Sequence, residues 1–275
     1  MPLSQNLPNF YYEKKFWHVK PANKRATCLP RESPKATFTG WKKGFEYVVG
    51  VDEVGRGAWA GPIVTAACAF VPQIKNLKFK IENLGINDSK LLKPKQREKL
   101  AKEIKKNALA WDVTEVGVGV INRIGIGRAT QKAMRKSIGD VIKKLRNEEI
   151  KHKKNSLNIL ISQYPNIFIL VDFYSIPYLR GLGRKNQLGI KNGDQKSISI
   201  ASASILAKVH RDKIMRSLSK KYPQYGWGKN KGYGTKLQQK AILRYGLTRY
   251  HRKEFVKTFL ENRRTVSRKG FGLSS

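Results

Sequence analysis

Four acidic residues that stand next to apolar segments are the first candidates for chemistry in this sequence. Two of them are consecutive and follow a short β-branched run, a third ends a similar run more than a hundred residues later, and the fourth precedes a long helical pattern. They are Asp52, Glu53, Asp172 and Asp194. Carboxylates gathered at one edge of a sheet repel one another unless a cation lies among them. Because oxygen ligands favour hard divalent cations, these residues predict a site for Mg²⁺ or Mn²⁺.

Each acid also has a purely structural interpretation. Asp52 and Glu53 can be solvated turn residues beside Gly55, and Asp172 can begin a turn. Asp194 is well placed to cap the helix that follows it, since aspartate accepts hydrogen bonds from the first backbone N–H groups of a helix. Spacing alone leaves both interpretations open.

The elements that must position these acids follow from the apolar patterns. Short β-branched and apolar runs predict strands, over Tyr47–Val51, Ile63–Val71, Val113–Val120 and Ile167–Val171. Apolar residues at spacings of three and four predict helices, over Pro94–Lys106, Ala129–Arg146 and Ile198–Leu218. Strands that alternate with helices indicate an α/β domain built on a mixed sheet.

The charge of the chain indicates a polyanionic partner. The 275 residues include 56 lysines and arginines but 19 aspartates and glutamates, which gives a formal net charge of +37. Such an excess attracts nucleic acid without giving sequence specificity. With 40% hydrophobic residues, the chain is too apolar for a disordered basic protein.

The chain has no features of secretion or membrane insertion. Cys28 and Cys68 are the two cysteines, and no spacing of cysteine and histidine typical of a zinc site is present. Residues 1–17 lack the apolar core of a secretory signal, and the uncharged segment 57–74 is a poor membrane span because of its Gly-Pro pair and polar residues. We therefore expect a cytoplasmic protein that does not contact a membrane.

The composition divides the chain into three parts. Residues 1–44 are rich in proline, lysine and aromatic residues, without helical or strand periodicity, and we interpret them as a basic N-terminal extension that is partly disordered. Residues 45–262 form the expected folded domain. Residues 263–275 are a basic tail containing glycine and serine.

Several motifs, in one order along the chain, resemble the bacterial ribonuclease HII family. The resemblance covers residues 46–255. Its N-terminal motifs are Val51-Asp52-Glu53-Val54-Gly55-Arg56-Gly57, Ala60-Gly61-Pro62 and Asn87-Asp88-Ser89-Lys90-Leu91. The middle motifs are Gly193-Asp194-Gln195-Lys196-Ser197, Ala203-Ser204-Ile205-Leu206-Ala207-Lys208-Val209 and Arg211-Asp212, and the last are Tyr222-Pro223-Gln224-Tyr225-Gly226, Lys231-Gly232-Tyr233-Gly234-Thr235 and His251-Arg252.

The resemblance implies a ribonuclease H-like fold, with a central mixed sheet flanked by helices and a C-terminal helical portion. It also implies a metal-dependent endonuclease that hydrolyses the RNA strand of RNA–DNA hybrids. Such an enzyme incises on the 5′ side of ribonucleotides embedded in duplex DNA and leaves 3′-hydroxyl and 5′-phosphate ends. The four acidic positions of the family fall on Asp52, Glu53, Asp172 and Asp194, where they would hold two Mg²⁺ or Mn²⁺ ions with the substrate bound. We expect a monomer.

The same resemblance assigns residues to substrate binding. Gly55, Arg56 and Gly57 match the glycine-rich loop whose backbone approaches the ribose 2′-hydroxyl, and Arg56 is suited to bind phosphate. Tyr233 matches the tyrosine that packs on the sugar at the RNA–DNA junction. Lys90 is expected to contact backbone phosphate, with a solvated surface lysine as the alternative. The pair His251-Arg252 serves either structure or phosphate binding.

Two further interpretations and several departures from the family pattern remain. A ribonuclease HIII-like enzyme usually has a larger N-terminal domain and lacks the arginine at the position of Arg56. A non-catalytic basic nucleic-acid-binding protein would fit the charge but leaves the four acids unexplained.

Phe173 follows Asp172 where the family usually has glycine, and Ala58 and Asn230 replace proline and histidine. None of these departures removes a proposed metal ligand.

Overall fold

A computed structural model describes residues 8–17, 45–70, 92–153, 166–179, 182 and 184–269, with the backbone alone at residues 17, 148–153, 184 and 262–269. The chain divides into two compact units. The first consists of Met1–Glu53, Thr65–Thr114 and Met134–Val209. The second consists of Val54–Val64, Glu115–Ala133 and His210–Ser275. Each unit is built from segments that lie far apart in the sequence.

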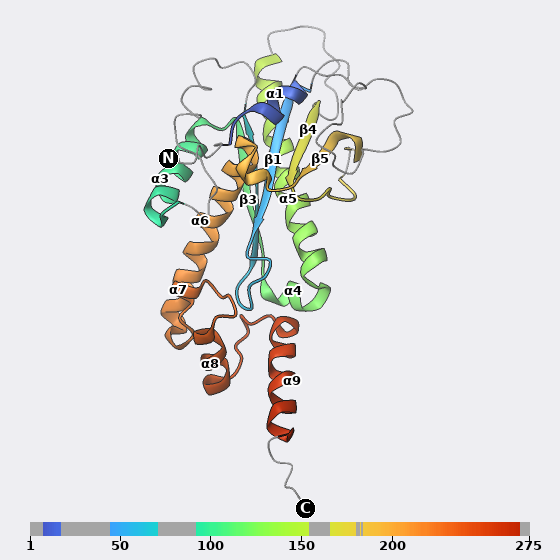
Figure 1. The fold of residues 1–275 in the computed structure, drawn as a ribbon. Coiled ribbons are helices and arrows are strands. Elements are labelled where there is room, and N and C mark those ends of the chain that lie inside the picture. Colours follow the sequence, from blue (N-terminus) through green and yellow to red (C-terminus); the bar gives the residue numbers. More distant parts are fainter. Residues whose placement is uncertain are drawn as a thin grey trace, which may run out of the picture. The chain divides into compact units, whose positions relative to one another are not determined.

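A five-stranded mixed sheet forms the centre of the first unit (Figure 1). Its strand order is β3-β2-β1-β4-β5. Strand β1 pairs in parallel with β4, which pairs in parallel with β5. The strands are β1 (Tyr47–Val54), β2 (Ile63–Phe70), β3 (Ala110–Val116), β4 (Ile167–Asp172) and β5 (Gln187–Ile190).

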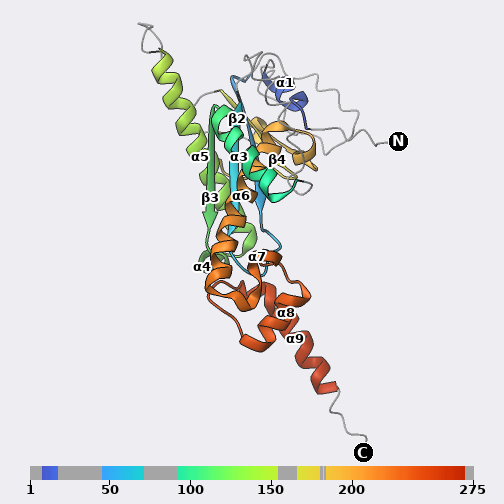
Figure 2. The ribbon, with the colours of Figure 1, turned by 90° about the vertical axis from the view of Figure 1, so that its left-hand side faces the viewer.

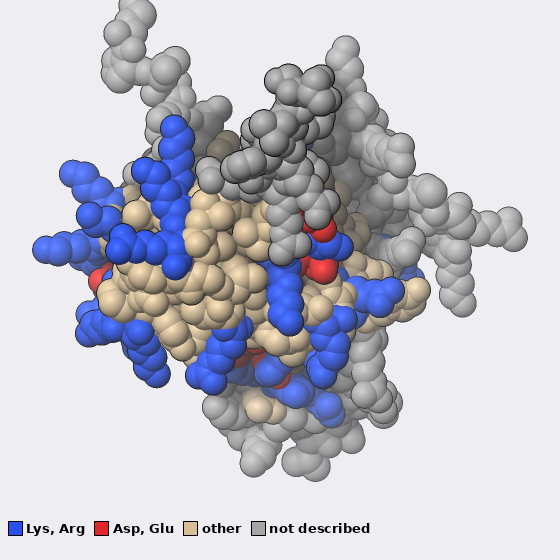
Figure 3. Space-filling model, turned by 90° about the horizontal axis from the view of Figure 1, so that it is seen from below, with Lys and Arg blue, Asp and Glu red and all other residues tan. Residues whose placement is uncertain are grey.

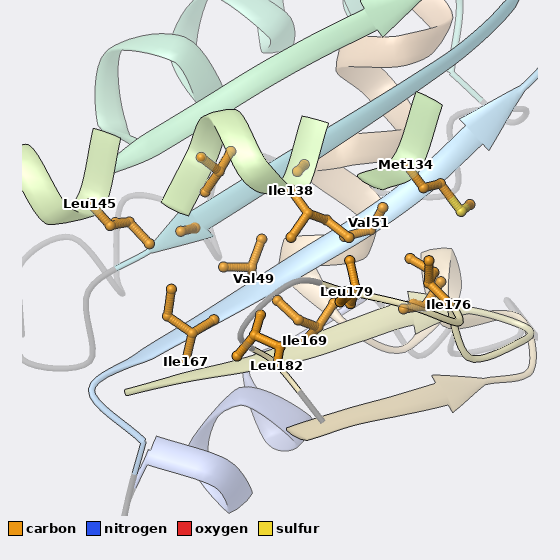
Figure 4. Packing of buried hydrophobic residues seen from close by; sticks show 14 of the residues in the cluster. Val49, Val51, Met134, Ile138, Leu145, Ile167, Ile169, Ile176, Leu179 and Leu182 are labelled. Atoms are coloured by element: carbon orange, nitrogen blue, oxygen red, sulfur yellow. The ribbon is translucent and has the colours of Figure 1, made fainter. Parts of the chain in front are cut away.

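Helix α5 (Ile126–Lys153) covers one face of this sheet. Alternate residues of β1 and β4 point to this face, as the two-residue period of a strand requires. They pack with apolar residues of α5 in one buried cluster (Figure 4), whose members include Val49, Val51, Met134, Ile138, Val141, Leu145, Ile167, Ile169 and Val171. The long apolar stripe of α5 therefore fixes the strands from which Asp52 and Asp172 extend.

The opposite face of the sheet carries the N-terminal helix α1 (Tyr11–Trp17). Phe168 lies between Ile167 and Ile169 on β4 and so points away from α5. The ring of Phe16 stacks on Phe168 with centroids 3.9 Å apart. Phe10 meets Phe70 of β2 edge-on at 6.0 Å. Figure 2 shows α1 and α5 on opposite sides of the strands.

Two further helices complete the first unit. Helix α3 (Pro94–Asn107) begins with proline at its first position, where the missing N–H group costs least. Helix α6 (Ile198–Lys221) begins directly after the turn that carries Asp194 and continues into the second unit from His210 onward. A short 3-10 helix, η1 (Arg184–Asn186), leads into β5.

The second unit is mainly helical. Its aromatic core is made by Tyr225 and Trp227, whose rings stack with centroids 5.0 Å apart and pack edge-on against His251. Its remaining elements are α4 (Val118–Ile124), η3 (Pro223–Tyr225), α7 (Trp227–Asn230), α8 (Lys236–Tyr245) and α9 (Lys253–Lys269). Helix α9 extends beyond residue 263, where the sequence suggested the beginning of a tail.

Most of the predicted elements are confirmed, with one error. The strands at residues 47–51 and 167–171 and the helices at 94–106, 129–146 and 198–218 all form, and the strand predicted over 63–71 forms as far as Phe70, with Val71 outside the described residues. The strand predicted over Val113–Val120 is wrong at its end, because β3 stops at Val116 and α4 begins at Val118. Among the described residues, no helix is both long enough and apolar enough to cross a membrane.

Candidate functional site

Asp52 and Asp172 lie at the same edge of the sheet. In the parallel pair of β1 and β4, Val51 stands opposite Val171, and the two aspartates are the next residues of their strands. Asp172 is also paired in register with Ile190 of β5. The carboxyl ends of three neighbouring strands therefore meet where Asp52 and Asp172 are placed, which is the usual location of ligand sites in open α/β sheets.

Asp194 is brought to this edge by a tight turn. It is buried within the 3-10 helix η2 (Gly193–Gln195), which follows β5. The backbone N–H of Gly193 donates a 2.7 Å hydrogen bond to Asp172 Oδ1, which ties the turn to the end of β4. Ser197 is the N-cap residue of helix α6, because its Oγ accepts the N–H of Ile200 at 3.3 Å. Asp194 lies three residues before this cap.

Gly50 allows helix α6 to approach strand β1 two residues before Asp52. A Cβ atom on Gly50 would lie 2.1 Å from the carbonyl carbon of Ser199 and 2.3 Å from the nitrogen of Ile200. No larger residue fits there without moving the helix or the strand. This close approach positions the first turn of α6, and the Asp194 turn before it, against β1.

The carboxylate of Asp52 is buried among the other three acids. Burial raises the pKa of Asp52 well above its usual range, and the charges of Glu53, Asp172 and Asp194 raise it further, against a hydrogen bond from Ser204 that lowers it. Asp52 Oδ1 also accepts the N–H of Glu53 at 2.6 Å. A buried group surrounded by like charges is one that a divalent cation would stabilise strongly.

The donor set fits a hard cation, although the side chains do not converge on one point. Within the described part of the chain, no three histidine, cysteine, aspartate or glutamate side chains form a ready-made ligand group. Mutual repulsion between carboxylates opposes such convergence. The charges of Glu53, Asp172 and Asp194 nevertheless raise the pKa of Asp52. Carboxylate oxygens are the ligands that Mg²⁺ and Mn²⁺ prefer.

In the second unit, the loop Gly55–Gly57 is held by the buried side chain of Arg252. Arg252 Nη1 donates to the carbonyl oxygens of Gly55 at 2.7 Å and Arg56 at 2.9 Å, and Nε donates to Gly61 at 3.0 Å. In a trans peptide the N–H points opposite to the carbonyl, and no described peptide bond is cis. The N–H groups of Arg56 and Gly57 therefore point away from Arg252. Two such successive N–H groups form a concave donor surface for an oxygen ligand.

A second buried arginine supports the same loop. Arg211 donates from Nε to Pro62 O at 3.0 Å and from Nη2 to Ala60 O at 3.1 Å. Gly55 has a φ of 92°, and a Cβ there would lie 2.1 Å from Arg211 Nε. Glycine is thus required both by the backbone conformation and by the space that Arg211 fills.

Both arginines are strongly desolvated. Burial lowers the pKa of Arg211, and it lowers the pKa of Arg252 to about 9, with the charge of Arg211 contributing. With a pKa of about 9, the Arg252 guanidinium remains charged at neutral pH. Within the described residues, Arg211 Nη1 and Arg252 Nη2 are buried without a hydrogen-bond acceptor.

Tyr233 lies on a loop that is joined by backbone hydrogen bonds to the residues just after the Gly55–Gly57 loop. The N–H groups of Trp59 and Ala60 both donate to Gly232 O, at 2.8 and 3.0 Å. The Arg211 guanidinium lies 5.7 Å from the centroid of the Tyr233 ring, which is 39% exposed. Arg211 therefore contacts both the glycine loop and the aromatic residue assigned to sugar packing.

The remaining candidate residues have different surroundings. Lys90 lies outside the described residues. Arg56 has an exposed side chain, as phosphate binding requires. His251 is buried, and its Nδ1 accepts the N–H of Thr248 at 2.9 Å. Because Arg252 is equally buried and bonded to backbone, the pair His251-Arg252 serves structure.

Sequence reasoning missed Glu13 and underestimated Arg211 and Arg252. Glu13 is a fully buried acid in the segment interpreted as an extension. Two features of the sequence could have pointed to Glu13: it lies among aromatic residues, and the chain has few acidic residues. For the two arginines, the motifs marked the positions but did not indicate that their guanidinium groups bind the carbonyls of residues 55–62.

The comparisons with known proteins agree with one family. The family model described as "Ribonuclease HII" matches residues 49–261. A ribonuclease HII from Caldanaerobacter subterraneus subsp. tengcongensis is 42% identical over 221 residues, which cover 80% of this chain and 78% of that protein. A ribonuclease HII from Caldicellulosiruptor saccharolyticus is 41% identical over 219 residues, covering 80% of this chain and 91% of that protein.

Solved structures support the fold. The crystal structure of the ribonuclease H2 from Pyrococcus horikoshii OT3 matches 79% of this chain and 99% of its own, with a TM-score of 0.52 and 25% identity. The ribonuclease HII in a complex with PCNA from Archaeoglobus fulgidus matches 76% of this chain and 94% of its own, with a TM-score of 0.55 and 22% identity, and so supports the fold alone. The predicted ribonuclease H-like fold is confirmed.

Proposed function

Because this chain belongs to the ribonuclease HII family, and is thus an endoribonuclease of the ribonuclease H type, we propose that it cuts RNA–DNA hybrids and duplex DNA containing single ribonucleotides in a metal-dependent reaction. The cut falls on the 5′ side of the ribonucleotide and leaves 3′-hydroxyl and 5′-phosphate ends. The observation that carries this proposal is the gathering of Asp52, Asp172 and Asp194 at one sheet edge, in a family whose chemistry is hydrolysis of RNA.

The four carboxylates are proposed as the ligands of two Mg²⁺ or Mn²⁺ ions. When bound, such ions activate a water molecule and stabilise the leaving 3′-oxygen in an in-line displacement. The protein contributes a buried carboxylate in Asp52, whose low-dielectric surroundings strengthen its attraction for a cation. The Gly193–Asp172 hydrogen bond restrains the direction of the Asp172 carboxylate.

The Gly55–Gly57 loop is proposed to recognise the ribose. Arg252 binds the carbonyls of Gly55 and Arg56, so the N–H groups of Arg56 and Gly57 point away from it, toward the proposed position of the 2′-hydroxyl. The 2′-hydroxyl is the group that distinguishes RNA from DNA. Tyr233, held by Arg211, is proposed to pack on the sugar at the junction between RNA and DNA.

The positive charge is proposed to bind the duplex without regard to its sequence. On the face drawn in Figure 3, the described lysine and arginine side chains are widely spread and acidic side chains are few. Contacts of this kind release counterions from nucleic acid, so the affinity for the substrate should fall steeply as salt is added. The scarce acids then serve the reaction, and the excess of basic residues serves binding.

The proposal is tested with a labelled duplex DNA that contains one ribonucleotide, beside an all-DNA duplex of the same sequence. We expect incision of the first duplex when Mg²⁺ or Mn²⁺ is supplied, no incision with a chelator, and no incision of the second duplex. Extension of the upstream product by a polymerase identifies its 3′-hydroxyl end. Tight binding without incision under either metal would indicate a non-catalytic nucleic-acid-binding protein.

A further inference from the structure

A buried glutamate links the N-terminal segment to the turn that carries Asp194. Glu13 Oε1 accepts a 2.6 Å hydrogen bond from Ser197 Oγ and a 2.9 Å hydrogen bond from the N–H of Ser199. Ser197 caps helix α6, and Ser199 lies in its first turn. A carboxylate at the beginning of a helix satisfies N–H groups that have no partner within the helix and interacts favourably with the helix dipole.

The hydrogen bonds continue from Ser197 to the proposed metal site. The N–H of Ser197 donates to Gly193 O at 2.8 Å, and the N–H of Gly193 donates to Asp172 Oδ1 at 2.7 Å. A continuous series therefore runs from Glu13 through Ser197 and Gly193 to Asp172. Asp194 lies inside this series, in the turn whose two ends are held by Glu13 and by Asp172.

The segment that supplies Glu13 is firmly packed. Phe16 stacks on Phe168 of β4, and Phe10 contacts Phe70 of β2. The backbone also takes part, because the N–H of Ile198 donates to Asn9 O at 3.2 Å. These aromatic contacts hold α1 in place, while the contact to Ser197 is made by Glu13.

Burying this carboxyl group is costly. Glu13 is fully buried, burial raises its pKa, and within the described residues its Oε2 has no hydrogen-bond partner. A glutamine, or an apolar residue of similar size, would avoid the cost of a buried charge. The hydrogen bonds that Oε1 accepts from Ser197 and Ser199 offset part of this cost.

We propose that Glu13 is a positioning residue for the carboxylate site, which acts through Ser197 and Gly193 to fix Asp194 and Asp172. The inference rests on the proposed function of these two aspartates. Glu13 then supports the carboxylate site from outside it, and the N-terminal segment is more than an appendage that attracts nucleic acid. Glu13 itself does not contact the substrate or the metal ions.

The test compares four variants of the full-length chain. Glu13→Ala and Glu13→Asp remove the contact to Ser197, by truncation and by shortening respectively. Glu13→Gln keeps an oxygen acceptor of the same reach. Phe16→Leu is the matched control, because it loosens the same segment through Phe168 but leaves Glu13 in place.

We expect kcat for the single-ribonucleotide duplex to fall about 10- to 100-fold in Glu13→Ala and Glu13→Asp, since small misplacements of catalytic groups have effects of this size. KM should change less than twofold, because substrate-binding residues are unaffected. Glu13→Gln should retain at least about half of the wild-type kcat. Phe16→Leu should lower the melting temperature and leave kcat unchanged below it.

Hydrogen exchange of the metal-free protein gives an independent readout. The amides of Gly193 and Ser197 should exchange faster in Glu13→Ala and Glu13→Asp, but not in Glu13→Gln or Phe16→Leu. An unchanged kcat and unchanged amide exchange in Glu13→Asp would overturn the proposal. A loss of kcat in Phe16→Leu equal to that in Glu13→Asp would do the same, because it would reduce Glu13 to general stability. Failure of the wild-type protein to cut would count against the proposed function, while the exchange comparison would still test the positioning.

Discussion

Arg252 donates a hydrogen bond from Nη1 to the carbonyl oxygen of Gly55 at 2.7 Å, between residues that are 197 positions apart in the sequence. The bond fixes the direction of the peptide that joins Gly55 to Arg56. A loop of two glycines and one arginine would otherwise have many conformations available, since glycine adopts left-handed conformations readily. The buried arginine thus restrains the conformation of the glycine loop.

Arg252→Lys should therefore impair ribose recognition. A lysine carries one ammonium group on a flexible stem and cannot reproduce three bonds of a planar guanidinium group. We expect kcat/KM for the single-ribonucleotide duplex to fall by about tenfold or more, from the loss of hydrogen bonds of about 1 kcal/mol each. Steady-state kinetics measure the effect, with Arg244→Lys as a control on an exposed arginine. Equal kinetics in the two variants would show that Arg252 does not organise the loop.

Asp52→Asn should stabilise the protein and remove its activity. Burial and the charges of Glu53, Asp172 and Asp194 raise the pKa of Asp52, so the ionised carboxylate is held in an unfavourable environment. A neutral amide relieves this repulsion, and we expect the free energy of unfolding to rise by about 1–2 kcal/mol in the presence of a chelator. Urea denaturation at neutral pH measures the change.

Asp140→Asn is the matched control for this variant. The hydrogen bond and charge of Lys136 lower the pKa of Asp140, so the amide should lower stability slightly or leave it unchanged. If Asp52→Asn lowers the free energy of unfolding, as Asp140→Asn is expected to do slightly, the result would contradict the claim that the other three acids repel Asp52.

Phe173→Gly should also stabilise the protein. Phe173 follows Asp172 with a φ of 73°, which is unfavourable for a residue with a Cβ atom, and its ring is 68% exposed. Glycine removes the backbone strain, and we expect a gain of about 1 kcal/mol in the free energy of unfolding. Phe173→Ala keeps the Cβ atom and loses the ring, and so it separates strain from packing. A loss of stability in Phe173→Gly would show that the ring contributes more than the strain costs.

His251 should make the stability depend on pH in the acid range. Burial lowers its pKa to about 4, and its Nδ1 accepts a hydrogen bond from Thr248, so the folded state holds a neutral ring. Between about pH 6.5 and pH 4 the unfolded chain binds a proton that the folded chain does not, so stability falls as pH is lowered, by up to about 3 kcal/mol. Below the folded pKa this contribution stops changing.

His251→Asn keeps an acceptor for Thr248 and cannot titrate. Its stability curve should be flatter than that of the wild-type protein between pH 6.5 and pH 4, as measured by urea denaturation at several pH values. Parallel curves for the two proteins would mean that His251 titrates normally in the folded state.

Several parts of the fold could be predicted because they follow from local pattern. The apolar runs of β1, β2 and β4 are buried on both faces, so they stand out as continuous hydrophobic segments. The wrong end of β3 has a local cause. Gly117 is extended and caps α4, while Val118 and Val120 have the β-branched character of a strand although they lie in a helix.

Other parts depend on contacts that no local pattern reveals. Strand β5 is four residues long and contains Gln187 and Gly189, and it forms because β4 supplies a partner. Helix α1 is seven residues long, too short to be stable alone, and is held by Phe16 against Phe168.

The candidate site divides in the same way. The acids at strand ends could be found because neighbouring parallel strands end at one edge of a sheet, and the resemblance named the same four residues. Glu13, Arg211 and Arg252 could not be assigned their roles. Their contacts join segments separated by about 150 residues or more, and such pairings follow from the folded structure.

The central claim is that the four acids at the sheet edge form the catalytic metal site of a ribonuclease. Its most direct test is Asp172→Asn beside the wild-type protein, on a duplex DNA with one ribonucleotide, in Mg²⁺ and in Mn²⁺. We expect the wild-type protein to incise on the 5′ side of the ribonucleotide, and the variant to bind the duplex with similar affinity but to cut at least about a hundredfold more slowly. Undiminished incision by Asp172→Asn would contradict the claim.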